Sequence, residues 1–547
     1  MAYLNKQAAS AVGKTSRIPR VLGPGPGLGV LSGMANPENN TLWALLQADV
    51  AARPDAIYAH FNGEPITFRE LAARATATSD RLRDHGAVPG DRIATMCRNS
   101  VEALILTFAL ARSGLVWVPV NARLKGDGLA YILGHSGPRL VVADPDMIPT
   151  IDAATGTKGV APVLALRDDL TSVGLSTCAE ASGAAYPSVP TAPADTWAIM
   201  YTSGTTGHPK GVIVTYRMLD LATQAVAATA LIKEGDVMFA WEPFYHIGGA
   251  QLLPLPMRNR TTIAFVDRFS AGRFWSQVAE CGATHIHYLG GILQILMKQP
   301  ASPADRAHRV RVAWGAGCVP EIWESFETRF GLRIRECYGM TEASSVTTFN
   351  DSGTPGVVGR PVPWFEVEIL DENGNRVAEG ARGEIVVTPL TEGALFPGYL
   401  DNPEATAKAL RNGRMHTGDS GSLLPTGELV FHGRMTDSVR CKGENVSAWE
   451  VEHVANKHSD VEECAMVGVA TDIGEQDIML FVKPKAGASF EEAKFVSWLA
   501  DHLAAYQVPR YIQCVAAFQH TPSERIMKHK LPKTTEKAWD RLRLTAK

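Results

Sequence analysis

A run of glycine, serine and threonine residues that ends in a lysine carries the clearest chemical signal in this 547-residue sequence. The run spans residues 202–211, follows the apolar, strand-length segment 197–201 and precedes the amphipathic segment 216–231. Glycines let backbone N–H groups converge, hydroxyls add donors and a lysine adds charge, so the pattern predicts a strand–loop–helix cradle for phosphate. It is not a Walker A loop, because Pro209 rather than glycine precedes Lys210. The alternative is a polar surface turn.

The string YTSGTTGHPKG at residues 201–211 resembles the signature loop of the adenylate-forming superfamily, which contains acyl-CoA synthetases, luciferases and peptide-synthetase adenylation domains. Further motifs follow in that family's order, so the resemblance extends from about residue 41 to residue 531. It implies that the loop binds the phosphates of ATP and that Lys210 is catalytic. The loop residues that it assigns to the nucleotide are Thr202, Ser203, Gly204, Thr205, Thr206 and Gly207.

Four further motifs resemble the rest of the family's nucleotide site. GAG at 315–317 resembles the turn against which adenine packs, and YGMTE at 338–342 resembles a motif whose tyrosine stacks on adenine, whose threonine contacts phosphate and whose glutamate holds Mg²⁺. TGD at 417–419 and GR at 433–434 resemble the pair that holds the ribose, where a carboxylate accepts hydrogen bonds from vicinal hydroxyls. The implied nucleotide ligands are Gly315, Ala316, Gly317, Tyr338, Gly339, Thr341, Asp419 and Arg434. Glu342, also counted as catalytic, and Thr205 are the implied metal ligands.

Two motifs concern the acid and the thiol. PFYHIGG at 243–249 resembles the aromatic–histidine motif that gates the acyl pocket, which makes His246 a candidate catalytic residue; a core or loop histidine is the alternative. KGEN at 442–445 resembles the segment that lines the pantetheine tunnel of acyl-CoA synthetases, where small residues leave room for a thiol. Coenzyme A is therefore expected to contact Lys442, Gly443, Glu444 and Asn445.

The thiol acceptor and the acid are less determined than the adenylation step. Peptide-synthetase adenylation domains carry a different string at 442–445 and an acidic residue near the position of Phe244, where we identify none. Both differences favour a CoA ligase, and the chain most resembles bacterial carnitine/crotonobetaine-type CoA ligases. The acyl pocket is expected to draw on residues 241–251, 287–294, 318 and 343–346. Aliphatic, aromatic and betaine-like acids all fit that mixture of side chains.

The sequence departs from the family near its C-terminus. Where a lysine usually contacts the carboxylate and the α-phosphate, residues 521–528 read TPSERIMK and place Arg525 at the lysine position. Arginine stays charged and can bridge two oxygens, but it is bulkier than lysine. We favour Arg525 as the catalytic cation; Lys528 as a substitute, slow adenylation and a merely solvated basic tail are the alternatives.

Helical and strand-like segments alternate after residue 41, with helices expected over 71–85 and 101–112 and strands over 91–97, 115–120 and 140–144. This alternation predicts parallel strands with crossover helices, an α/β fold. The resemblance implies a large α/β domain of layered sheets and helices, followed by a small mobile C-terminal α+β domain. The expected divisions are a flexible arm at 1–40, the AMP-binding domain at 41–434 and the small domain at 435–547, with a hinge near 434–437.

Composition narrows the partners and the compartment. A net charge of −4 without long runs of one sign argues against a nucleic-acid partner. The N-terminus lacks a signal-like apolar core, and the most apolar stretch carries Glu102 and Arg112, so we expect a cytoplasmic protein without a membrane span. Eight scattered cysteines without CxxC spacing fit a reducing compartment and argue against zinc. His285 and His287 favour a buried or pocket-lining pair over a metal site, and a homodimer is left open.

These observations predict an ATP-dependent, AMP-forming acid–CoA ligase that acts on a small carboxylic acid. ATP, Mg²⁺ and coenzyme A, the last as a co-substrate, are the expected cofactors. The small C-terminal domain is expected to swing about its hinge between two half-reactions. The alternatives are a stand-alone enzyme that loads a carrier-protein thiol and a non-catalytic nucleotide-binding homologue.

Overall fold

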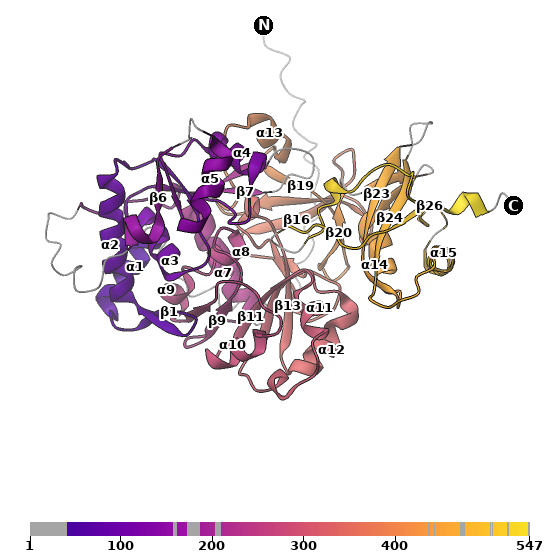
Figure 1. Cartoon of the computed structure of the whole chain (residues 1–547), viewed down its shortest axis with the longest axis horizontal. Helices are drawn as coiled ribbons and strands as arrows, with labels where there is room; N and C mark the ends of the chain where they lie inside the picture. The colour runs from indigo at the N-terminus through magenta and orange to yellow at the C-terminus, as the bar shows by residue number, and fades with distance from the viewer. Residues whose placement is uncertain are drawn as a thin grey trace, which may run out of the picture.

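The computed structural model describes residues 41–156, 161–171, 186–202, 209–435, 438–441, 444–470, 476–503, 505, 507–521 and 525–544. Figure 1 shows a large body of sheets and helices, with a smaller body of sheet and helix at the C-terminal end of the long axis. The predicted fold class, a large α/β domain followed by a small C-terminal domain, is confirmed. In the described part of the chain, no helix is long and apolar enough to cross a membrane.

The first part of the chain forms a largely parallel sheet, as the alternation of segments predicts. In spatial order its strands are β6 (Val163–Ala165), β5 (Leu140–Ala143), β3 (Arg92–Met96), β4 (Val116–Pro119), β7 (Thr196–Thr202) and β8 (Lys210–Thr215). The helices near it are α1 (Leu42–Ala52), α2 (Phe68–Asp84), α3 (Val101–Arg112), α4 (Gly126–Ser136) and α5 (Ile148–Thr155). Helix α3 has the predicted bounds because the Ser100 hydroxyl caps it, accepting the Ala103 N–H at 3.0 Å.

The segment that follows the phosphate loop differs from its prediction. Strands β7 and β8 pair antiparallel, with Thr202 opposite Lys210, and helix α7 (Tyr216–Ala230) begins only after β8. The predicted strand–loop–helix layout is therefore wrong, since a strand separates the loop from the helix. Val212, Ile213 and Val214 explain the difference, because β-branched residues favour a strand.

The second sheet is the largest and positions most of the candidate site. In spatial order its strands are β15 (Arg360–Pro361), β14 (Thr348–Phe349), β13 (Arg333–Tyr338), β12 (Val312–Ala316), β11 (His285–Leu289), β9 (Val237–Ala240), β10 (Thr262–Phe265), β1 (Ile57–Phe61) and β2 (Glu64–Thr67). Strands β13, β12, β11 and β9 are mutually parallel neighbours. Their carboxyl ends therefore lie at one edge, which is where ligands bind in open α/β sheets. The helices of this part are α8 (Ile247–Ala250), α9 (Leu255–Asn259), α10 (Phe274–Glu280), α11 (Ile292–Met297) and α12 (Pro320–Phe330).

An antiparallel sheet completes the large body, and the C-terminal body follows it. The antiparallel strands are β16 (Phe365–Leu370), β17 (Gly383–Pro389), β19 (Arg414–Leu423), β18 (Leu410–Arg411) and β20 (Leu429–Arg434), with helix α13 (Pro403–Ala409) nearby. The C-terminal body contains β21 (Ser438–Cys441), β22 (Glu444–Ser447), α14 (Ala448–Ala455), β23 (Val461–Ala470), β24 (Gln476–Pro484), α15 (Glu492–His502), β25 (Tyr511–Cys514) and β26 (Trp539–Asp540). Val451, Leu480 and Leu499 belong to a hydrophobic core of this body that is separate from the cores of the large body.

Candidate active site

The predicted adenine turn lies at the carboxyl end of β12 and requires glycine at its first position. Gly315 has φ 157°, and a Cβ there would lie 1.9 Å from the Tyr288 carbonyl oxygen of the neighbouring strand. A buried carboxylate that the sequence did not reveal, Glu336 of β13, holds the turn. It accepts the Gly317 N–H at 2.5 Å, the Cys318 N–H at 3.2 Å and the Tyr288 hydroxyl at 2.5 Å. Burial raises the pKa of Glu336 to about 7, although these donors lower it in part.

Two paired strands, β19 and β20, bring the predicted ribose residues to the predicted adenine tyrosine. Asp419 of β19 pairs with Arg434 of β20 across the antiparallel ladder, and Arg434 Nε lies 3.0 Å from Asp419 Oδ1. The Tyr338 hydroxyl donates to Asp419 Oδ2 at 2.7 Å. Burial raises the pKa of Asp419, while Arg434 and the tyrosine hydroxyl oppose that rise. The arrangement holds one charged acceptor beside one aromatic ring, which suits a ribose and its base.

Tyr399, which sequence reasoning missed, lies close to both Lys210 and Glu342. Its hydroxyl donates to Glu342 Oε1 at 2.9 Å, and Lys210 Nζ lies 5.0 Å from the centroid of its ring. Strand β8 supplies Lys210, and Glu342 lies in the short 3₁₀ turn Thr341–Ala343 that follows β13. The later segment around Gly398, whose carbonyl accepts the Ile213 N–H, brings Tyr399 to both residues.

The Glu342 carboxylate fits a magnesium ion as a hard oxygen ligand. Its Oε1 takes the tyrosine hydroxyl, and among the described residues no donor occupies Oε2. The described residues contain no cluster of three His, Cys, Asp or Glu side chains arranged for a metal. A single carboxylate is still sufficient, because Mg²⁺ keeps water ligands and takes the remainder from substrate phosphates.

Several predicted site residues lie outside the described residues. These are Ser203, Gly204, Thr205, Thr206 and Gly207 of the loop, and Lys442 and Gly443 of the expected thiol segment. Their flanks are described: Thr202 ends β7, and Glu444 and Asn445 begin β22, where the backbone alone is placed. The hinge residues Thr436 and Asp437 also lie outside the described part.

The two basic candidates near the C-terminus lie in different surroundings. Lys528 is bonded within the C-terminal body, with Nζ 2.8 Å and 3.0 Å from the two carboxylate oxygens of Glu452. The charge of Arg525, in contrast, is close enough to lower the pKa of both Asp419 and His246. Burial has the larger effect on each group: it raises the pKa of Asp419 and lowers the pKa of His246. The exposed Arg525 charge therefore lies within electrostatic range of a predicted ribose residue and a predicted acyl residue, whereas the Lys528 charge is paired with a glutamate.

The predicted acyl side contains an acidic residue that the sequence interpretation overlooked. Glu242 lies two positions before Phe244 and two positions after the end of β9, and its side chain is buried. The expectation that no acidic residue lies near Phe244 is therefore wrong. His287 of β11 is its neighbour, with Nδ1 3.1 Å from Glu242 Oε2. The expectation of a buried histidine pair agrees with His285, whose Nε2 bonds the Ala230 carbonyl at 2.9 Å.

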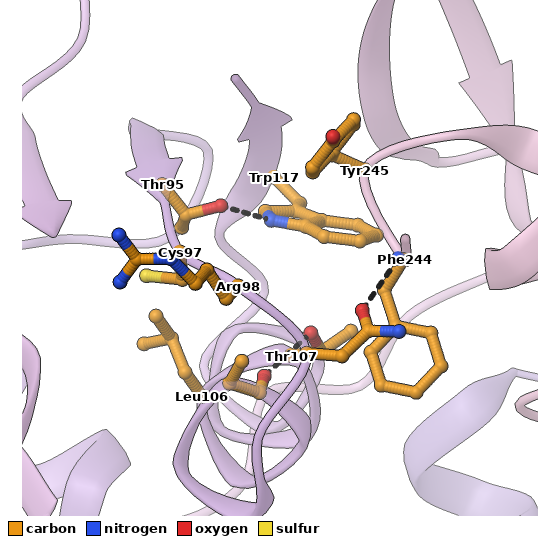
Figure 2. Close-up of a pocket in the computed structure, with 10 residues that line it drawn as sticks. Thr95, Cys97, Arg98, Leu106, Thr107, Trp117, Phe244 and Tyr245 are labelled. Carbon is orange, nitrogen blue, oxygen red and sulfur yellow. Dashed lines mark hydrogen bonds between the residues drawn. The ribbon is translucent and has the colours of Figure 1, made fainter. Parts of the chain in front are cut away.

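A buried asparagine anchors the segment that carries Glu242 and Phe244. The Asn99 amide donates to the Glu242 carbonyl at 3.0 Å and to the Val266 carbonyl at 3.3 Å, and it accepts the Phe244 N–H at 3.0 Å. A small pocket lies beside this anchor, with Phe244 and Tyr245 facing Thr95 and Cys97 across it (Figure 2). Of the residues expected to form the acyl pocket, Phe244 and Tyr245 are those that line this pocket.

Comparison with known proteins identifies the family. Residues 46–400 match the model of the AMP-binding enzyme family, and residues 450–525 match its C-terminal domain. A medium/long-chain-fatty-acid–CoA ligase of Mycobacterium tuberculosis is 31% identical over 542 residues, which cover 94% of this chain and 90% of that protein. A crotonobetaine/carnitine–CoA ligase of Salmonella heidelberg is 30% identical, covering 85% of this chain and 93% of that protein.

A solved structure agrees with these relatives. ATP-bound MatB from Rhodopseudomonas palustris superposes with a TM-score of 0.80 at 26% identity, covering 90% of this chain and 98% of that one. The two family models thus cover most of the large body and of the C-terminal body. The chain therefore belongs to the AMP-binding enzyme family, as an acid–thiol ligase of its AMP-forming acyl-CoA synthetase branch.

Proposed function

We propose that the edge formed by β13, β12, β11 and β9 carries out the ligase reaction with ATP, a small carboxylic acid and coenzyme A. The observation that supports it best is the convergence of Lys210, Glu342 and the Tyr338–Asp419–Arg434 group with the charge of Arg525. Adenine would pack between Tyr338 and the Gly315–Gly317 turn, and the ribose hydroxyls would donate to Asp419. Oδ1 of that carboxylate is paired with Arg434 Nε at 3.0 Å, and a carboxylate oxygen can accept a further hydrogen bond from a ribose hydroxyl.

The first half-reaction joins the acid to the α-phosphate. A carboxylate oxygen of the acid attacks the α-phosphorus, the bond to the bridging oxygen of the β-phosphate breaks, and pyrophosphate leaves with that electron pair. Negative charge gathers on the phosphoryl oxygens, so Lys210, Arg525 and the loop N–H and hydroxyl groups stabilise the transition state. A magnesium ion on Glu342 would add Lewis-acid stabilisation there. No side-chain nucleophile is required.

The second half-reaction transfers the acyl group to the thiol of coenzyme A. The sulfur attacks the acyl carbonyl carbon, the carbon–oxygen bond to AMP breaks, and the thiol proton is lost to solvent. We assign the thiol path to residues 442–445 and the domain boundary to residues 434–437. In the present arrangement the C-terminal body is held against α12, where Glu321 Oε1 lies 2.9 Å from Lys457 Nζ and 3.2 Å from His453 Nε2. Rotation about the boundary would break these contacts and replace Arg525 by the thiol segment.

Acid-dependent exchange of labelled pyrophosphate into ATP, measured across a panel of acids, tests adenylation. We expect exchange with at least one acid and a loss of about 100-fold or more in Lys210→Ala and in Glu342→Ala, because each removes a charged group at the phosphates. Arg268→Ala, which changes an exposed residue outside the site, is the matched control. Exchange that survives unchanged in both site variants would overturn the assigned roles.

A second assay separates the two acceptors. After adenylation, free coenzyme A is added and the thioester is quantified by mass spectrometry. We expect stoichiometric acyl-CoA and AMP. Exchange without thioester formation would instead favour loading of a carrier-protein thiol, and no exchange with any acid would favour a non-catalytic nucleotide-binding protein.

A further inference from the structure

A buried carboxylate on the acyl side, that of Glu242, pairs with no lysine or arginine among the described residues. Glu242 is only 4% exposed, and its Oε2 accepts no hydrogen bond of good geometry from those residues. The ion pairs of the described residues include no lysine or arginine with Glu242; its single partner there is the imidazole of His287. Removing an ionised carboxylate from water costs several kcal/mol or more unless a partner compensates it.

The groups around this carboxylate are polar atoms without partners and aromatic faces. Gln251 Oε1, His246 Nε2 and His287 Nδ1 are also buried without a hydrogen bond among the described residues. The Gln251 amide donates to the Gly248 carbonyl, and a Cβ at Gly248 would lie 2.3 Å from Glu242 Oε2, so the carboxylate packs directly against Gly248. The His287 ring stacks on Trp241 and packs at a tilt against Trp314, with centroids at 6.1 Å and 4.3 Å. A carboxylate and an amide oxygen are acceptors that suit an ammonium ion.

This cluster lies beside the predicted nucleotide residues. His287 pairs with Trp314 across β11 and β12, and Trp314 directly precedes the Gly315–Gly317 turn. The Glu242 charge also acts on the buried imidazole of His246, whose pKa burial lowers. An acid bound beside the nucleotide therefore has the Glu242 cluster as its neighbour.

We propose that Glu242 recognises a positively charged ammonium group at the end of the substrate acid remote from its carboxylate. This inference rests on the proposed function and names the substrate class of the same site. An ammonium group with N–H donors would also satisfy Gln251, whereas a quaternary ammonium group would rely on the Glu242 charge. An uncharged chain of the same shape would leave the Glu242 carboxylate buried without a cation, so it would bind more weakly.

Two pairs of acids with matched shapes test this proposal. The first pair is 5-aminopentanoate with hexanoate, and the second is 4-(trimethylammonio)butanoate with 5,5-dimethylhexanoate. For each acid, kcat/KM is measured from pyrophosphate release by the full-length enzyme. We expect the cationic member of at least one pair to exceed its neutral partner by about 100-fold, and Glu242→Gln to bring that ratio near one. The pair that shows the preference identifies the ammonium group as protonated or quaternary.

The neutral acids serve as an internal control for folding. Glu242→Gln should use them at least as well as the parent enzyme does, which a misfolded protein would not. Glu242→Asp keeps the charge and should lower the ratio only in part, and Glu234→Gln at an exposed position should leave it unchanged. If neutral acids are adenylated and the ratio is one or less in both pairs, or if Glu242→Gln leaves it unaltered, the inference fails while the proposed function stands. If no acid of this set or of the broader panel is adenylated, both fail.

Discussion

Asp419 and Glu242 are two buried carboxylates of the candidate site with different partners. Asp419 is 2% exposed and has Arg434 at 3.0 Å and the Tyr338 hydroxyl at 2.7 Å. Glu242 is 4% exposed and has an imidazole at 3.1 Å, with no arginine or lysine paired to it in the described chain. The two carboxylates are almost equally buried, so they differ in whether a charged side chain of the protein is paired with them.

This difference follows from what each side must bind. The ribose is neutral, so a carboxylate that binds it needs its own cation from the protein, and β20 supplies Arg434. The acid varies between members of a ligase family, and a carboxylate left without a cation selects an acid that brings one. The nucleotide side is therefore complete in the chain, whereas the acyl side is completed by its ligand.

The largest expected effect comes from removing Arg525, whose charge acts on Asp419 of the nucleotide side and on His246 of the acyl side. We expect Arg525→Ala to slow adenylation by about 100- to 1000-fold, because it removes a charge from the developing phosphoryl oxygens. Lys528→Ala is the matched control and should cost less than about fivefold, since Lys528 is paired with Glu452. Pyrophosphate exchange measures both. The opposite ranking would assign the catalytic cation to Lys528.

Removing Arg434 would give Asp419 the surroundings that Glu242 has now. We expect Arg434→Gln to weaken ATP binding by about 30-fold. This is less than the full cost of breaking a buried ion pair, because the Arg434 side chain is 39% exposed and solvent screens the pair. The pKa of Asp419, which burial already raises, should rise further, so ATP affinity should fall at low pH more steeply than in the parent enzyme. Calorimetric titration with ATP at several pH values measures this. Arg434→Lys keeps the charge, so its affinity for ATP should lie between that of the parent enzyme and that of Arg434→Gln.

The nucleotide side could be predicted from sequence more completely than the acyl side. Tyr338, Asp419 and Arg434 occur in motifs whose residue types match a fixed ligand, and the structure brings them together. Tyr399 was missed because it reaches Lys210 and Glu342 from a distant segment that carries no motif. Glu242 was missed because an isolated glutamate beside an aromatic run is indistinguishable from a surface residue until its burial is known.

Helix α3 and the β7–β8 hairpin show the same contrast: the helix is determined by neighbouring residues, whereas the hairpin also depends on contacts with a distant segment. Helix α3 was predicted to the residue, since Ser100 caps it and its apolar run ends at Gly114. The β7–β8 hairpin was missed because its glycine-rich loop and lysine matched a strand–loop–helix pattern. Gly211 accepts the Leu400 N–H at 2.8 Å, so a long-range contact helps to hold β8 as a strand.

Asn99 offers a way to disturb the acyl side alone. We expect Asn99→Ala to raise KM for the acid about tenfold, because the segment that carries Glu242 and Phe244 loses two hydrogen bonds and Val266 loses a third, while KM for ATP stays within about twofold. Asn99→Asp keeps the acceptor for the Phe244 N–H but turns the donor into an oxygen that faces two carbonyls, so its effect should be at least as large. Initial rates with each substrate varied in turn provide the measurement. Equal changes in both KM values would show that Asn99 supports the fold generally and not the acyl segment.

Glu336 completes the comparison, because its carboxylate is compensated by N–H and O–H donors without a cation. Its pKa is raised by burial from 4.5 to about 7, so between these pH values the folded chain binds more protons than the unfolded chain. The free energy of unfolding should therefore fall as pH rises through this window, by about 3 kcal/mol in total, and level off above it. Glu336→Gln keeps the shape and cannot ionise, so it should remove this slope while changing kcat little. Urea unfolding of both proteins across the window measures the difference. Equal slopes would mean that hydrogen bonds alone keep Glu336 ionised, and then the missing cation at Glu242 would lose its significance as well.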